Sequence, residues 1–115
     1  INRGGEKVST DEIENHIAAH PAVQNVCVVA MPDRVFGAKA CAFVIPRSGA
    51  QLDFEALKDF LLARGIAKFK LPERLELVDA FPLSPAGKVL RRELRDVIAA
   101  RLASEGDADR PPRAA

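Results

Sequence analysis

The sequence predicts a small α+β domain, in which helices pack on a roughly three-stranded sheet, with a glycine-containing hairpin at the N-terminal end. Two stretches open with helix-capping residues and continue with apolar residues at helical spacing. Two short apolar runs, at residues 26–30 and 38–45, are typical of strands. A chain of 115 residues is long enough for one such domain with one core.

The N-terminal stretch, residues 1–8, is polar and centred on Gly4 and Gly5. Adjacent glycines let the backbone turn tightly or approach a ligand closely, because no Cβ is in the way. The spacing alone favours a hairpin turn.

The first helix begins after Ser9, which stands three residues before Glu12 in the pattern of a capping box. Ile13 and Ile17 fall on one face at helical spacing, and Pro21 stops the helix. We expect the carboxylates of the first turn to favour this helix, because they complement the positive end of its dipole.

Two strands are expected to follow, and a third at residues 75–78. The run at 26–30 fits a strand that is buried on both faces, and about seven residues separate it from the second strand, so the two can pair as neighbours. Cys27 and Cys41 lie inside these runs. They are expected to be small core residues in a reducing cytoplasm, with a cross-strand disulfide as the less favoured alternative.

The second helix is expected to begin after Asp53 and to end at Gly65. Leu52 and Leu57 are placed to form a hydrophobic staple across the first turn. The buried stripe is expected to comprise Phe54, Leu57, Phe60 and Leu61.

A last helix is expected after Lys88, with arginines on its outer side. Its apolar stripe is expected to comprise Leu90, Leu94, Val97, Ile98 and Leu102. Residues 104–115 are small, charged and proline-containing, so we expect a disordered tail there and a domain over residues 1–103.

Charge and composition exclude several classes of function. The net charge is +1, but residues 64–103 carry nine basic and five acidic side chains, which suits an anionic partner. The aromatic content of 5%, without Trp or Tyr, offers little for stacking bases, so a nucleic-acid partner is not expected. No apolar run is long enough to span a membrane.

The sequence predicts no metal site. His16 and His20 lie on the first helix without a third ligand near them, and the two cysteines have no partners at zinc-ligand spacing. Both histidines are therefore expected at the surface or at the C-terminal end of that helix.

Residues 82–88, Pro-Leu-Ser-Pro-Ala-Gly-Lys, form the most informative stretch. Two prolines and Gly87 favour a stiff turn, which holds Lys88 at a defined place before the last helix. An ammonium on a flexible stem suits a phosphate or a carboxylate, because it carries three donors and needs no fixed plane. On composition alone, Lys88 is more simply a solvated surface lysine.

Several short motifs, taken in order, change that balance. Residues 1–7 followed by Glu12, Ile13 and Glu14 resemble the eighth core motif of the adenylate-forming superfamily, and residues 85–89 resemble the tenth. That superfamily comprises acyl-CoA synthetases, peptide-synthetase adenylation domains and luciferases. Four further segments resemble short motifs of the family and occur at the spacing that the family shows: residues 20–23, 31–33, 36–37 and 68–72. Leu90 departs from the family pattern, which often has Asp or another polar residue there.

Residues 2–7 and 65–72 are most similar to aryl-acid activating enzymes of siderophore biosynthesis, such as 2,3-dihydroxybenzoate-AMP ligases. Salicylate-activating relatives would look much the same, and oxalate-CoA ligases are the nearest rival. The resemblance implies a C-terminal lid domain, with the large N-terminal adenylation domain outside this chain.

The resemblance implies a reaction in two halves. ATP, with Mg²⁺ held mainly by the N-terminal domain, would activate an aryl carboxylic acid to an acyl adenylate. The acyl group would then pass to the phosphopantetheine thiol of an aryl carrier protein, or to CoA.

The resemblance also implies the site residues. Lys88 would be catalytic in the first half-reaction, and Gly4, Gly5, Lys7 and Gly87 would lie beside the bound nucleotide or pantetheine arm. Lys7, Arg34 and Lys70 are candidates for docking an acidic carrier protein.

A different class of function stays open from the residues alone. The 115 residues hold no nucleophile with a base and no phosphate loop, which also fits a stand-alone α+β binding module without a reaction of its own. Sequence upstream of Ile1 would discriminate the two.

Overall fold

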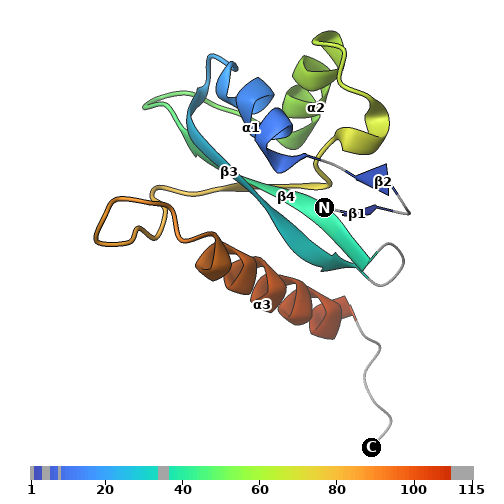
Figure 1. The fold of residues 1–115 in the computed structure, drawn as a ribbon, viewed down its shortest axis with the longest axis vertical. Helices are drawn as coiled ribbons and strands as arrows, with labels where there is room; N and C mark the ends of the chain where they lie inside the picture. Colours follow the sequence, from blue (N-terminus) through green and yellow to red (C-terminus); the bar gives the residue numbers. More distant parts are fainter. Residues whose placement is uncertain (1, 4–5, 8, 34–36, 110–115) are drawn as a thin grey trace, which may run out of the picture.

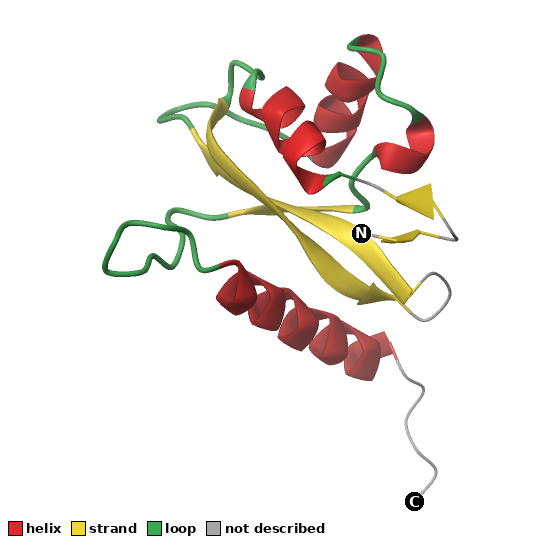
Figure 2. Cartoon of the chain, viewed as in Figure 1, coloured by secondary structure: helices red, strands yellow, loops and turns green. Residues whose placement is uncertain are grey.

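A mixed β-sheet lies between two layers of helices (Figure 1). The computed structural model describes residues 2–3, 6–7, 9–33 and 37–109. Helices α1 and α2 cover one face of the sheet, and α3 covers the other (Figure 2). The elements in chain order are β1 (Asn2–Arg3), β2 (Glu6–Lys7), α1 (Thr10–Ala18), β3 (Val23–Asp33), β4 (Gly37–Pro46), α2 (Phe54–Ala63), the 3₁₀ helix η1 (Lys68–Lys70), β5 (Arg74–Leu77) and α3 (Arg91–Asp109).

Strand β4 is the centre of the sheet. It pairs with β3 in antiparallel fashion on one side and with β5 in parallel fashion on the other. The hairpin of β1 and β2 joins the β5 side of β4 through the pairing of Arg3 with Gly37. The predicted α+β fold with three main strands and an N-terminal hairpin is confirmed. Gly4 and Gly5, on which that prediction rested, lie outside the described residues.

The middle of β4 is buried on both faces, since residues 40–44 are each 0% exposed. Alternate side chains of a strand point to opposite faces. Ala40, Ala42 and Val44 therefore pack with α1 and α2, while Cys41 and Phe43 pack with α3. This explains why the run at 38–45 is apolar without alternation.

The beginnings of α1 and α2 are capped as predicted. The Ser9 side chain accepts a hydrogen bond from the Glu12 amide at 3.3 Å, and Asp53 accepts one from the Ala56 amide at 2.7 Å. Each bond satisfies an amide that the helix itself leaves without a partner. These two caps fix where the chain enters the helical layer.

Gly65 ends α2 in a Schellman motif. Its φ is +87°, its amide donates to Leu62 O at 3.0 Å, and the Ile66 amide donates to Leu61 O at 3.1 Å. A left-handed residue is what this motif requires, and glycine adopts that conformation at little cost.

Several expectations about element limits and burial are wrong. In α2 the buried residues are Leu57 and Leu61, whereas Phe54 and Phe60 of the expected stripe are half-buried. Strand β3 runs from Val23 to Asp33, beyond residues 26–30, because β4 pairs with it over nearly its whole length. Pro32 is tolerated in it because β3 is an edge strand in the described sheet, where a missing amide breaks no ladder.

Helix α3 continues to Asp109, so the tail predicted from Ser104 onward is helical up to that residue. Glu105 in this extension forms a bidentate ion pair with Arg74 of β5, which anchors the added turn. Val97, expected in the buried stripe, is 40% exposed. The seam of α3 consists of Leu94, Ile98 and the half-buried Leu102, spaced four residues apart.

Cys27 and Cys41 are free thiols in the core between the sheet and α3, as predicted for small core residues. They do not face each other, because Cys27 pairs with Phe43 and Cys41 with Val29. Burial raises the pKa of Cys41 to about 12, since the thiolate would lose its hydration. The pKa of Cys27 is raised for the same reason. Both are therefore inert packing residues at neutral pH.

None of the helices in the described part of the chain is both long enough and apolar enough to cross a membrane.

The seam of α3 predicts a contrast between two neighbouring residues. Ile98→Ala removes a side chain that is 0% exposed, so we expect it to lower the free energy of unfolding by ~2–5 kcal/mol. Val97→Ala, at a site that is 40% exposed, should cost less than ~1 kcal/mol. Urea denaturation of the purified variants measures both values. Equal losses would show that α3 packs through a different face.

Candidate functional site

The loop that carries Lys88 is a three-residue hairpin turn. The Ser84 amide donates to Lys88 O at 2.8 Å, and the Gly87 amide donates to Ser84 O at 2.9 Å. The Lys88 amide donates to the Ser84 hydroxyl at 3.2 Å. Gly87 has a φ of +83°, the left-handed residue that closes such a loop. The residues predicted to form a stiff turn therefore do so.

The base of this hairpin is attached to the core. Leu83 and Val89 form a bridge, and the Leu90 amide donates to Pro82 O at 2.8 Å. Phe81 is 8% exposed in the core between the sheet and α3, and Val89 packs against the same cluster. The hairpin thus projects from a packed base rather than from a long flexible segment.

Lys88 itself is exposed. Its Nζ forms no hydrogen bond or ion pair with any residue that the structure describes. A lysine ammonium is a mobile point charge with three donors. Placed one residue after a closed turn, it is available to an anionic group outside this chain.

The other predicted site residues lie at the opposite end of the sheet. Figure 1 shows the Lys88 hairpin near the start of α3, well away from β1 and β2. The hairpin of β1 and β2 meets β4 at Gly37, whereas Val78, which leads to Lys88, bonds to Val44. Seven residues of strand span about 23 Å. The structure therefore does not bring Lys88 together with β1 and β2.

Gly4 and Gly5 lie outside the described residues, and Lys7 is described only as a member of β2. Among the residues proposed to dock a carrier protein, Arg34 also lies outside them. Lys70 is partly engaged, because its Nζ is 3.3 Å from a carboxylate oxygen of Glu12.

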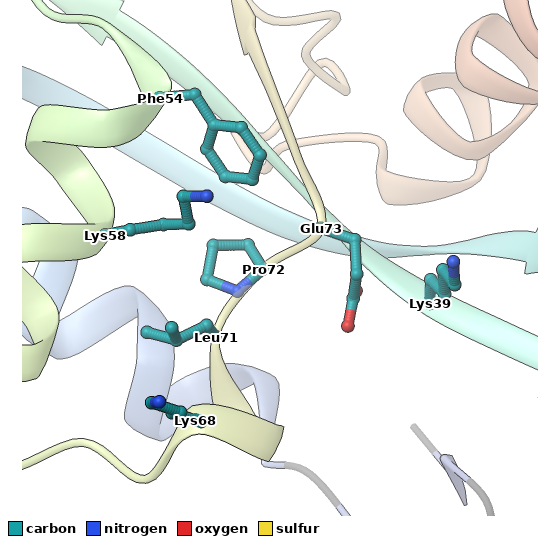
Figure 3. A pocket seen from close by; sticks show the side chains of 7 residues that line it. All are labelled: Lys39, Phe54, Lys58, Lys68, Leu71, Pro72 and Glu73. Carbon is teal, nitrogen blue, oxygen red and sulfur yellow. The ribbon is translucent and has the colours of Figure 1, made fainter.

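A second feature, which the sequence did not reveal, is an open pocket of about 380 Å³ between α2, η1 and the start of β5. Figure 3 shows Pro72 in the middle of the lining, with Lys58 to one side and Glu73 and Lys39 to the other. The pocket is lined by Lys39, Phe54, Lys58, Lys68, Leu71, Pro72 and Glu73.

The pocket is mainly basic, with an apolar floor. Lys58 Nζ lies 2.8 Å from Glu55 Oε1 and 4.6 Å from the centre of the Phe54 ring. Lys68 on η1 is exposed. The motif at residues 68–72 was visible in the sequence, but Lys39 and Lys58 come from separate elements, and only the fold brings them to it.

Neither feature is a metal site. Among residues 2–3, 6–7, 9–33 and 37–109, no group of three His, Cys, Asp or Glu side chains could hold an ion. His16 accepts a hydrogen bond from Arg64, and His20 accepts one from the Ala22 amide. Both histidines therefore have roles within the fold at the surface and end of α1, as predicted.

The chain matches the family model of the AMP-binding enzyme C-terminal domain over residues 12–88. It is 49% identical over 102 residues to 2,3-dihydroxybenzoate-AMP ligase of Bacillus subtilis, covering 89% of this chain and 19% of that protein. It is 51% identical over 96 residues to pyochelin synthase PchD of Pseudomonas aeruginosa, covering 84% and 17% respectively.

A solved structure, ATP-bound MatB from Rhodopseudomonas palustris, matches with a TM-score of 0.81 and 32% identity. The match covers 86% of this chain and 20% of that one. The chain thus spans about a fifth of the length of the proteins it matches.

The hairpin turn predicts a strained substitution. A Cβ on Gly87 would meet no atom within 4 Å, so Gly87→Ala should cost only the strain of its left-handed φ, or ~1–2 kcal/mol of unfolding free energy. Gly49→Ala, at a φ of +77° and in equally open space, should cost about the same. Denaturant unfolding compares the two, with Ala86→Ser as a neutral control. A loss at Gly49 without one at Gly87 would mean that the Lys88 turn is not held in this conformation.

Proposed function

Because the chain belongs to the family of AMP-binding enzyme C-terminal domains, we propose that it is the C-terminal domain of an aryl-acid-AMP ligase. The enzyme would activate 2,3-dihydroxybenzoate or salicylate with ATP and pass the acyl group to the phosphopantetheine thiol of a carrier protein. The name of the Bacillus subtilis relative, a 2,3-dihydroxybenzoate-AMP ligase, supports this acid class. The domain would comprise residues 1–103, with α3 continuing past its end.

Lys88 would serve the first half-reaction. As the carboxylate attacks the α-phosphorus of ATP, negative charge builds on the phosphoryl oxygens and on the bridge to pyrophosphate. Lys88 would neutralise that charge from the tip of its hairpin, as a charge clamp and not as a base. The observation that carries this proposal is an exposed ammonium that has no partner among the described residues, on a turn closed by three hydrogen bonds. Such preorganised contacts are worth ~100- to 1,000-fold in rate.

ATP and Mg²⁺ would be bound mainly by the N-terminal adenylation domain, outside this chain. The ATP-bound state of the MatB structure supports nucleotide use in this family. Gly87 would contribute by holding the turn that presents Lys88 to the nucleotide. No step is assigned to a metal held by the described residues.

The second half-reaction would use the opposite end of the sheet. Gly4 and Gly5 would line a channel for the pantetheine arm, where a Cβ would obstruct it, and Lys7 would lie beside them. One end of the domain cannot occupy the active site while the other does. The separation of the Lys88 hairpin from β1 and β2 therefore supports a lid that rotates between the two half-reactions (Figure 1).

The basic pocket would dock the carrier protein. Lys39, Lys58 and Lys68 surround an apolar floor, which suits an acidic surface that presents one apolar side chain. We assign docking to these lysines in preference to Lys70, which is not part of the pocket lining. An acceptor such as CoA, which has no such surface, would not need them.

Lys88→Ala, in the enzyme that contains both domains, should lower the rate of the first half-reaction by ~100- to 1,000-fold, because no other described side chain replaces its charge. Acid-dependent exchange of pyrophosphate into ATP measures this step. Thioester formation from a supplied acyl adenylate should change less than about twofold, since Lys88 would be withdrawn in that half-reaction. Equal loss in both assays would refute the assignment.

Lys68→Glu should raise KM for the carrier protein by about 10-fold, through like-charge repulsion at the docking surface. Pyrophosphate exchange should stay unchanged, because it involves no carrier. Arg47→Glu is the matched control, since Arg47 is also exposed but follows the far end of β4. The pocket is not the docking surface if Lys68→Glu and Arg47→Glu impair acyl transfer to the carrier protein equally. The same conclusion follows if Lys68→Glu lowers the rates of acyl transfer to CoA and to the carrier protein equally.

A further inference from the structure

Glu14 and Arg91 join the two helical layers around the outer edge of the sheet. Glu14 lies on α1 and Arg91 is the first residue of α3, on opposite faces (Figure 1). The two Nη atoms of Arg91 donate to the two carboxylate oxygens of Glu14 at 2.6 and 3.1 Å. The Glu14 side chain is 15% exposed and that of Arg91 is 44% exposed. This bidentate pair ties α1 directly to the start of α3.

The same pair also binds the backbone of β3. The Val28 amide donates to Glu14 Oε1 at 2.8 Å, and Val28 O accepts from Arg91 Nη1 at 3.1 Å. Strand β3 pairs with β4 on its inner side, so these groups face the outer side. The carboxylate and the guanidinium supply the acceptor and the donor that a neighbouring strand would supply. Arg91 is thus held by three acceptor atoms on two elements.

Arg91 stands three residues after Lys88, at a helix start that lacks a side-chain cap. Leu90 occupies the capping position and has no polar side chain to bond the first amides. The hydrogen bonds to Glu14 raise the pKa of Arg91, so its charge persists throughout the working pH range. Arg91 therefore takes the place of a cap in fixing where α3 begins.

We propose that Glu14 and Arg91 are positioning residues that set the place of Lys88 relative to the sheet. This rests on the proposed function of Lys88. The Lys88 hairpin has two ends: one is fixed by the core around Phe81, and the other is the start of α3. Without the pair, that second end keeps the Leu90 to Pro82 bond, the Leu83 to Val89 bridge and the packing of Val89 and Leu94, but loses its link to α1 and β3.

The other end of α3 provides matched controls. Arg101 Nη1 donates to Glu76 Oε2 at 2.9 Å, and Glu105 pairs with Arg74, both linking α3 to β5. Arg101 is 48% exposed at its side chain, much like Arg91. Both sets of ion pairs hold α3 to the rest of the domain, but Arg91 stands three residues after Lys88, whereas Arg101 stands 13 residues after it.

The test uses the two-domain enzyme and measures each half-reaction separately. Arg91→Ala should lower kcat of pyrophosphate exchange by about 10- to 100-fold, because a misplaced catalytic group loses rate steeply with distance. KM for ATP and for the acid should change less than about threefold, and thioester formation from a supplied acyl adenylate less than about twofold. Arg101→Ala should leave both half-reactions within about twofold of the parent enzyme.

Because Arg91→Ala could fail to fold, a second and milder variant, Glu14→Gln, is tested with Glu105→Gln as its control. Glu14→Gln keeps the shape and one acceptor, so we expect a smaller loss of exchange, about threefold or more, with the thioester step intact. Equal loss in both half-reactions, no loss of exchange, or equal effects of the Glu14 and Glu105 variants would overturn the proposal. If Lys88→Ala loses pyrophosphate exchange while Arg91→Ala retains it fully, the positioning role of Arg91 is rejected and the proposed function of Lys88 stands. Full exchange in Lys88→Ala would reject the proposed function itself.

Discussion

The burial of β4 on both faces is the constraint on which the rest of the domain depends. Five successive residues from Ala40 to Val44 are 0% exposed, so neither helical layer can be removed without exposing half of this strand. Alanines at 40 and 42 leave room for α1 and α2, whereas Phe43 fills the space under α3. The strand thus fixes two layers at once. Each end of it then adjoins a segment to which we assign a role in the proposed reaction, the β1 and β2 hairpin near Gly37 and the path to Lys88 near Val44.

Local physical signals explain what the sequence could predict. The caps at Ser9 and Asp53 and the left-handed Gly65 each depend on a few neighbouring residues, so both helices could be located from sequence. The same holds for the turn at residues 84–88, in which Pro85 restricts the backbone and Gly87 permits a left-handed conformation. In both cases the information is contained within one turn of the chain.

What could not be predicted depends on contacts between distant segments. The extension of α3 depends on Arg74, which pairs with Glu105 only once β5 and α3 are adjacent. Val97 is exposed because α3 packs through Leu94, Ile98 and Leu102, and the spacing of the apolar residues does not decide between these faces. The basic pocket assembles lysines from β4, α2 and η1, and the Glu14 and Arg91 pair joins residues 77 positions apart. These features follow from the topology rather than from local sequence.

The Glu14 and Arg91 ion pair, which binds the backbone of Val28, also affects whether copies of this domain can associate through the edges of their sheets. An edge strand of 11 residues offers a row of unpaired backbone groups to any extended chain nearby. At Val28, near the middle of β3, the outward amide and carbonyl are already bonded to Glu14 and Arg91. A second chain that paired along the whole of this edge would have to displace the bidentate ion pair from the backbone groups of Val28. The domain thus resists edge-to-edge self-association with two side chains that cost its sheet no hydrogen bond.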